Sequence, residues 1–121
     1  MLICETPLAG GAWEQHGVDI AEDGGLPLIG SRPVKTGVAA FDQRFTVWED
    51  GAPMRAGWLD APARVAVTAL FDSTPLSGSL WVRGGRMQYV AVAPKGVDGE
   101  TLAKVLHTES VVGFAFERTV V

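Results

Sequence analysis

Two alternating runs of residues, joined by Gly84-Gly85, constrain the fold of this chain more than any other part of its sequence. Within Ser79–Val92, apolar and polar side chains alternate on both sides of the glycine pair. A period of two is typical of β-strands. A two-residue Gly-Gly loop suits a type I′ turn, because both central positions of that turn need positive φ. The segment therefore predicts an antiparallel β-hairpin.

The two-residue loop also sets the register of this hairpin. We expect one face of it to pack against a helix through four apolar side chains: Leu80, Val82, Met87 and Tyr89. Trp81 and Gln88 pair on the opposite face. Arg83 and Arg86 flank the turn, where we expect them to lie side by side in solvent.

A second alternating segment, Phe41–Asp50, predicts another strand. Phe45 and Val47 would point to one face of the sheet, and Trp48 to the other. Gly51-Ala52-Pro53 would end this strand, because glycine and proline are frequent in turns.

The next segment predicts helical structure in two parts. Its first part holds three apolar residues at helical spacing, Met54, Trp58 and Leu59. Asp60 then suits an N-cap, and Pro62 suits the first turn of a helix over Ala61–Phe71, because a missing N–H has no consequence there. The apolar side of this helix would comprise Ala66, Ala69 and Leu70.

A second helix is predicted at Gly99–Thr108, where Asp98 supplies the N-cap. Its apolar stripe would comprise Leu102, Val105 and Leu106. His107 would lie near the C-terminus of this helix, where the helix dipole favours positive charge. For Val111–Val121, the phenylalanines and the β-branched end favour a strand, although no turn signal before Gly113 separates it from the helix.

The length of 121 residues suits a single domain, 1–121. Residues 1–40 are rich in glycine and proline, so we expect an irregular β region without helices there. Residues 41–121 would form the sheet-and-helix core. The predicted class is α+β, an antiparallel sheet with two helices packed on one face and the irregular N-terminal β region.

The composition excludes several classes of function. A net charge of −4 with scattered basic residues argues against a nucleic-acid surface. Cys4 is the sole cysteine, so no internal disulfide can form, which fits a reducing compartment. The chain has no apolar run long enough to span a membrane, and its first residues do not resemble a signal peptide. We therefore expect a cytoplasmic protein.

No cluster of titratable residues predicts an active site. His16 lies near Glu14 and Asp19, but a metal site needs further ligands, so solvated polar residues are the better interpretation. His107 and Glu109 lack a predicted pocket, and Cys4 lacks a nucleophile motif and suits a buried position in a strand. We therefore expect no catalytic residue, no metal and no cofactor.

The tryptophans suggest a binding surface instead. Trp48 and Trp81 both fall on predicted outer faces, and together they could form a platform for a partner protein, with acidic residues beside Trp48 to receive a basic peptide. Burial of that face by other segments is the alternative. We favour a non-enzymatic protein-binding or scaffolding module.

Two other functions stay open. A small-ligand-binding protein or enzyme could use a pocket between the N-terminal segment and the sheet, with Arg44, Gln88 and His16 as its polar residues. Self-association through an exposed strand edge or the apolar C-terminal tail would instead give a homo-oligomer.

Residues 41–92 also resemble an uncharacterised bacterial family. The resemblance rests on Phe41–Val47 followed by an acidic break, on Leu59–Ala63, and on Arg83–Val90. This chain reads Leu-Asp-Ala-Pro where the family has Leu-x-Pro, and Met-Gln-Tyr where it has Leu-Tyr. Members of that family often carry transmembrane helices before this part, so the resemblance implies the cytosolic domain of a membrane-anchored protein or a relative without the anchor. It implies no catalytic residues.

Overall fold

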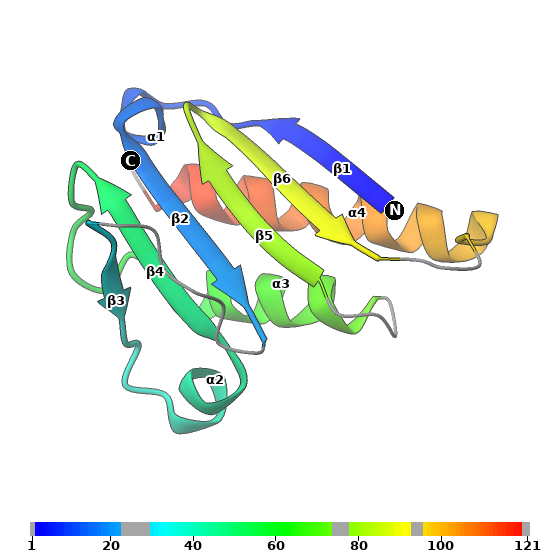
Figure 1. Cartoon of the computed structure of the whole chain (residues 1–121), viewed down its shortest axis with the longest axis horizontal. Coiled ribbons are helices and arrows are strands. Elements are labelled where there is room, and N and C mark those ends of the chain that lie inside the picture. The colour runs from blue at the N-terminus through cyan, green and yellow to red at the C-terminus, as the bar shows by residue number, and fades with distance from the viewer. Residues whose placement is uncertain (1, 23–29, 74–77, 93–95, 120–121) are drawn as a thin grey trace.

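The computed structural model describes residues 2–22, 30–73, 78–92 and 96–119. Its strands are β1 (Leu2–Pro7), β2 (His16–Ala21), β3 (Arg32–Val34), β4 (Thr46–Gly51), β5 (Gly78–Arg83) and β6 (Arg86–Ala91). They form one sheet of six strands in the order β1-β6-β5-β2-β4-β3 (Figure 1). Every pairing within it is antiparallel. The N-terminal region thus contributes strands to the same sheet as the later segments.

The helices are α1 (Gly11–Gln15), α2 (Ala39–Arg44), α3 (Ala61–Asp72) and α4 (Gly99–Arg118). The two long helices, α3 and α4, pack against each other and lie on the same side of the sheet, behind it in Figure 1. This arrangement confirms the predicted α+β class, with an antiparallel sheet and two helices on one face.

The predicted hairpin is confirmed as β5 and β6. Gly84 and Gly85 have φ values of 57° and 77°, as a type I′ turn requires. The register is the predicted one. Its four apolar side chains are fully buried beneath the helices, and they are Leu80, Val82, Met87 and Tyr89.

The predicted start of α3 is also confirmed. The Asp60 carboxylate accepts a hydrogen bond from the Ala63 backbone N–H at 3.1 Å, and Pro62 lies in the first turn. The buried stripe of α3 comprises Ala63, Ala66, Val67, Leu70 and Phe71. Ala69 was predicted to join it but is exposed, because it lies one helical step beyond this stripe.

The tail after the predicted second helix is helical, so the predicted strand at Val111–Val121 is wrong over the described residues. α4 runs on to Arg118 because Val105, Val112 and Phe116 form one continuous buried stripe at helical spacing. Leu102 and Leu106 were predicted to be part of the apolar stripe but are 37% and 49% exposed, on the solvent side of α4. Although α4 has 20 residues, no helix among those described is long and apolar enough to cross a membrane.

The predicted strand at Phe41–Asp50 is correct only in its second half. Phe41 belongs to α2, and the strand begins at Thr46. The rings of Phe41 and Phe45 pack at a centroid distance of 4.8 Å, because a helical turn brings residues four apart together. The Asp42 carboxylate also accepts hydrogen bonds from the Thr36 and Gly37 backbone N–H groups beside the start of this helix.

Two more expectations are wrong. The first 40 residues contain a helix, α1, which carries Trp13 into the core. The Trp13 ring stacks on Phe116 at 5.4 Å, and its indole N–H donates to the Phe116 carbonyl. The segment with Met54 and Trp58 forms turns rather than a helix. Trp58 is nevertheless buried, and its ring packs edge-on against Trp13.

Candidate binding face

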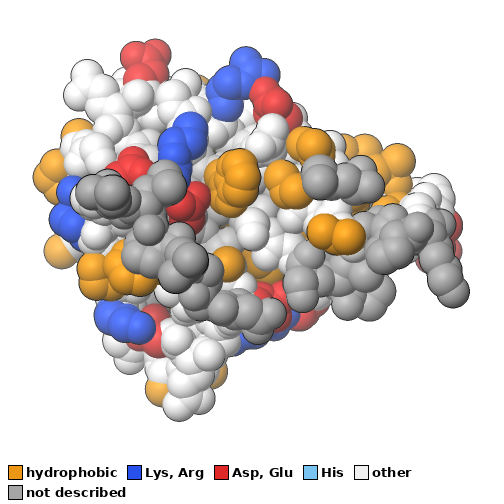
Figure 2. All heavy atoms as spheres, viewed as in Figure 1, with side chains coloured by type: hydrophobic (Ala, Val, Ile, Leu, Met, Phe, Trp, Pro, Cys, Tyr) orange, Lys and Arg blue, Asp and Glu red, His pale blue; other side chains and the backbone are white. Residues whose placement is uncertain are grey.

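The face of the sheet opposite α3 and α4, called the open face below, carries a row of side chains that crosses every strand. Read from β1 to β3, this row is Glu5, Gln88, Trp81, Asp19, Trp48 and Pro33. No described helix covers it in Figure 1. Figure 2 looks onto this face and shows acidic and basic side chains next to one another, with hydrophobic side chains beside them.

Trp48 and Trp81, the two tryptophans predicted to face outward, lie in this row on either side of Asp19. Trp81 is 45% exposed, which is high for the largest side chain in proteins. Trp48 is half-buried. Trp81 is therefore the more accessible of these two tryptophans.

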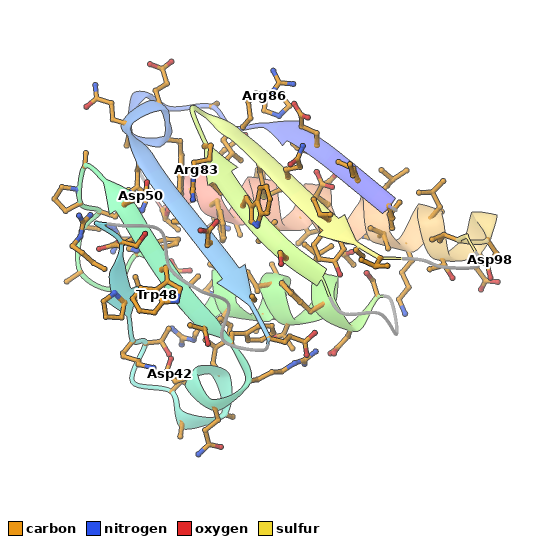
Figure 3. All side chains as sticks on the ribbon, in the orientation of Figure 1. Asp42, Trp48, Asp50, Arg83, Arg86 and Asp98 are labelled. Carbon is orange, nitrogen blue, oxygen red and sulfur yellow. The ribbon has the colours of Figure 1, made fainter. Side chains whose placement is uncertain are left out.

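Arginine–carboxylate pairs surround Trp81. The Arg83 guanidinium lies 2.9 Å from Asp19 Oδ2 and 3.5 Å from Asp50 Oδ2. Arg86 pairs with Glu5. Figure 3 shows Arg83, Arg86 and Asp50 on this side of the sheet. The two arginines do flank the turn, but each pairs with a carboxylate of the neighbouring strand, Arg83 with Asp19 of β2 and Arg86 with Glu5 of β1.

A shallow recess of about 190 Å³ lies among these pairs, lined by Glu5, Trp81, Arg83, Arg86 and Gln88. The Gln88 amide donates to Glu5 at 3.3 Å. Within the two clusters, Glu5, Asp19 and Asp50 carry three negative charges against the positive charges of Arg83 and Arg86. The two clusters together therefore carry a net charge of −1, which arises because Asp19 and Asp50 share one guanidinium.

Sequence reasoning did not single out Asp19 and Glu5 as members of a binding face. Strand alternation is the signal that could have found Asp19, because Val18 and Ile20 point into the core and the residue between them must point outward. Its position between two tryptophans depends on the pairing of β2 with both β4 and β5, which no local pattern encodes.

The predicted ligand pocket is not formed by its three polar residues. Gln88 lies on the open face, but Arg44 lies on α2, where it bonds Asp72 at 2.7 Å and Glu22 at 3.3 Å. His16 points to the helix side of the sheet. These candidates therefore do not converge on one site.

His16 is buried, so its prediction as a solvated residue is wrong. Its Nδ1 lies 2.5 Å from the Ala52 carbonyl oxygen, and its Nε2 lies 3.7 Å from a Glu49 carboxylate oxygen. The rings of Trp13 and Trp58 pack against it in edge-on geometry. These contacts give His16 a structural role that ties α1 to the loop after β4.

Cys4 is buried on β1, as expected, next to Glu109 of α4. Burial and the neighbouring Glu109 carboxylate raise the pKa of the Cys4 thiol to about 11, so it is a neutral thiol and a poor nucleophile. His107 was predicted near the C-terminus of its helix, but it is exposed in the middle of α4. The predicted interaction with the helix dipole is therefore wrong, because that effect is confined to the last turn.

Among the described residues, no group of three or more His, Cys, Asp or Glu side chains is placed to hold a metal ion. Comparisons of the chain with protein-family models, with curated proteins and with solved structures find no match.

Proposed function

We propose that this chain is a non-enzymatic binding module whose open face, centred on Trp81 and Asp19, binds a basic segment of a partner protein. The observation that carries the proposal is the exposure of Trp81 in a recess between charged pairs. Tryptophan is among the residues most enriched where binding energy concentrates in protein interfaces, because one rigid ring buries a large area.

The chemistry of this face favours a cation. An arginine or lysine side chain can lie over the face of a tryptophan ring, which attracts positive charge. Asp19 lies beside Trp81 in the row, and it shares the single Arg83 guanidinium with Asp50. A partner cation would therefore meet both an aromatic face and the uncompensated negative charge of this cluster.

The alternative functions have less support. The ligand pocket or active site predicted between the N-terminal segment and the sheet needs convergent polar groups, and its candidates Arg44, His16 and Gln88 lie apart. Self-association, the cytoplasmic location and the resemblance to a bacterial family all stay predictions.

Selection of peptides from a displayed random library on the immobilised chain tests the proposal. Peptides that survive should carry arginine or lysine, and Trp81→Ala should weaken their binding at least about tenfold through loss of the cation–π contact and the anchor. Phe114→Ala is the matched control, because Phe114 is an exposed aromatic residue on α4. Peptides without basic residues, or with equal affinity for Trp81→Ala, would contradict the proposal.

A further inference from the structure

A second recess lies on another part of the molecule, between α2 and α3. This α2–α3 groove has a volume of about 710 Å³, within the range typical of small-molecule sites. The rings of Phe41 and Phe45 form part of its lining, and both are buried in the core behind it. Val38 and Val65 line it with exposed side chains, Val65 being 69% exposed.

The side of α3 that lines the groove has two parallel lines of residues at a spacing of four. One line is small and apolar and comprises Ala61, Val65 and Ala69. The other is polar and comprises Arg64, Thr68 and Asp72. At 1.5 Å per residue, the polar line extends about 12 Å from Arg64 to Asp72.

The two ends of the polar line differ in charge. Asp72 shares the Arg44 guanidinium with Glu22, at 2.7 Å and 3.3 Å, so two carboxylates meet one positive charge at that end. Arg64 donates to the Leu59 backbone carbonyl at 2.8 Å, and among the described residues it has no carboxylate within ion-pair distance. Arg64 also lies in the first turn of α3, at the positive end of the helix dipole. The groove thus has a cationic end at Arg64, an apolar middle and an acidic end at Asp72.

We infer that the α2–α3 groove binds an anionic amphiphile, a molecule with one carboxylate and a medium-length alkyl chain. The carboxylate would accept hydrogen bonds from the Arg64 guanidinium, for which planar bidentate pairing is favourable. The alkyl chain would lie along Val65 and Ala69, where it removes apolar surface from water. This site shares no residue with the open face and does not depend on the proposed function.

Isothermal titration of the full chain with sodium decanoate, kept below its micelle concentration, tests the inference. Saturable binding is expected, with amide shifts in a parallel NMR titration at Val65, Thr68 and Val38. Arg64→Gln should weaken binding about tenfold, as for loss of one charge-assisted hydrogen bond. Arg64→Lys should recover part of the affinity, and decyltrimethylammonium should bind at least about tenfold more weakly than decanoate.

Matched variants keep the test independent of folding. Arg118→Gln removes an exposed arginine from α4 and should leave decanoate binding unchanged. Val65→Glu should abolish binding while keeping the fold, because Val65 is exposed. Equal affinity for decanoate and decyltrimethylammonium, unchanged binding by Arg64→Gln, or shifts confined to α4 or the open face would overturn the inference. Absence of saturable decanoate binding would overturn it as well.

Discussion

The Thr6 hydroxyl of β1 donates a hydrogen bond to the Glu109 carboxylate of α4, joining the first strand to the last helix. Glu109 is only 2% exposed, because it lies on the buried side of α4 together with apolar residues such as Val105 and Val112. Burial raises its pKa, while the hydrogen bonds from Thr6 and Cys4 act in the opposite direction. The net effect is a pKa of Glu109 above its ordinary value, with burial as the largest cause.

Glu109→Gln should change how stability depends on pH. Because the folded-state pKa of Glu109 is raised, the free energy of unfolding of the parent chain should fall as the pH rises from the ordinary pKa of an unfolded glutamate through the folded-state pKa. Glutamine does not titrate, so the variant should lack this decrease. The free energy of unfolding of the variant should therefore rise relative to that of the parent chain as the pH increases.

Urea unfolding at a series of pH values measures this difference. Glu100→Gln is the control, because Glu100 is exposed in the first turn of the same helix and its removal should leave the pH dependence near that of the parent chain. Parallel curves for the parent chain and Glu109→Gln would contradict the prediction. They would show that the pKa of Glu109 is the same in the folded and unfolded states, despite its burial.

Trp81→Ala and Trp13→Ala should lower stability by very different amounts. Trp13 is fully buried against Phe116, so its removal should lower the free energy of unfolding by about 3–5 kcal/mol. Trp81 lies on the open face, so its removal should lower it by at most about 1 kcal/mol. Urea unfolding compares the two variants. A loss for Trp81→Ala as large as that for Trp13→Ala would mean that Trp81 is a core residue.

Gly17→Ala should disturb the charged pairs of the open face. A Cβ at this position would overlap the Asp50 carboxylate and lie 3.0 Å from an Arg83 guanidinium nitrogen. The variant should therefore be less stable by about 1–3 kcal/mol, as expected for overpacking. Gly11→Ala is the control, because its Cβ would meet no atom within 4 Å. Equal melting temperatures for the two variants would contradict the close packing at Gly17.

Asp60→Ala should lower the free energy of unfolding by about 1 kcal/mol, because the Ala63 N–H loses its capping partner. Asp60→Asn keeps an acceptor oxygen and should retain most of the stability. Thermal unfolding gives the stabilities, and hydrogen exchange at the Ala63 amide reports the cap directly. Unchanged exchange in Asp60→Ala would show that the cap contributes little to the start of α3.

Features that depend on neighbouring residues were predictable from the sequence. The Gly84-Gly85 turn determines its own backbone shape, and Asp60 and Asp98 each cap a helix that begins at the next residue. The boundary between α2 and β4 was not predictable in this way. Phe41 and Phe45 fit both a helical spacing of four and an alternating strand, and only their packing against each other decides between the two.

Features that depend on contacts between segments far apart in the sequence could not be predicted from local patterns. The outward direction of Trp48 and Trp81 followed from alternation, but their placement around Asp19 follows from β2 lying between β4 and β5. His16 was expected in solvent because it lies near Glu14 and Asp19 in the sequence, without further ligands for a metal site. Its burial comes from Trp13 and Trp58, which the tertiary fold brings around it.

An NMR titration of the isotope-labelled chain with the peptide acetyl-Arg-Gly-Arg-amide tests the central claim most directly. The account predicts saturable shifts at the Trp81 indole N–H and at the amides of Asp19 and Gln88. These shifts should be absent with the matched acetyl-Glu-Gly-Glu-amide peptide, and in Trp81→Ala the amide shifts should be lost. Equal shifts with both peptides, or shifts that gather on α3 and α4 instead, would contradict the claim that the open face binds a basic segment.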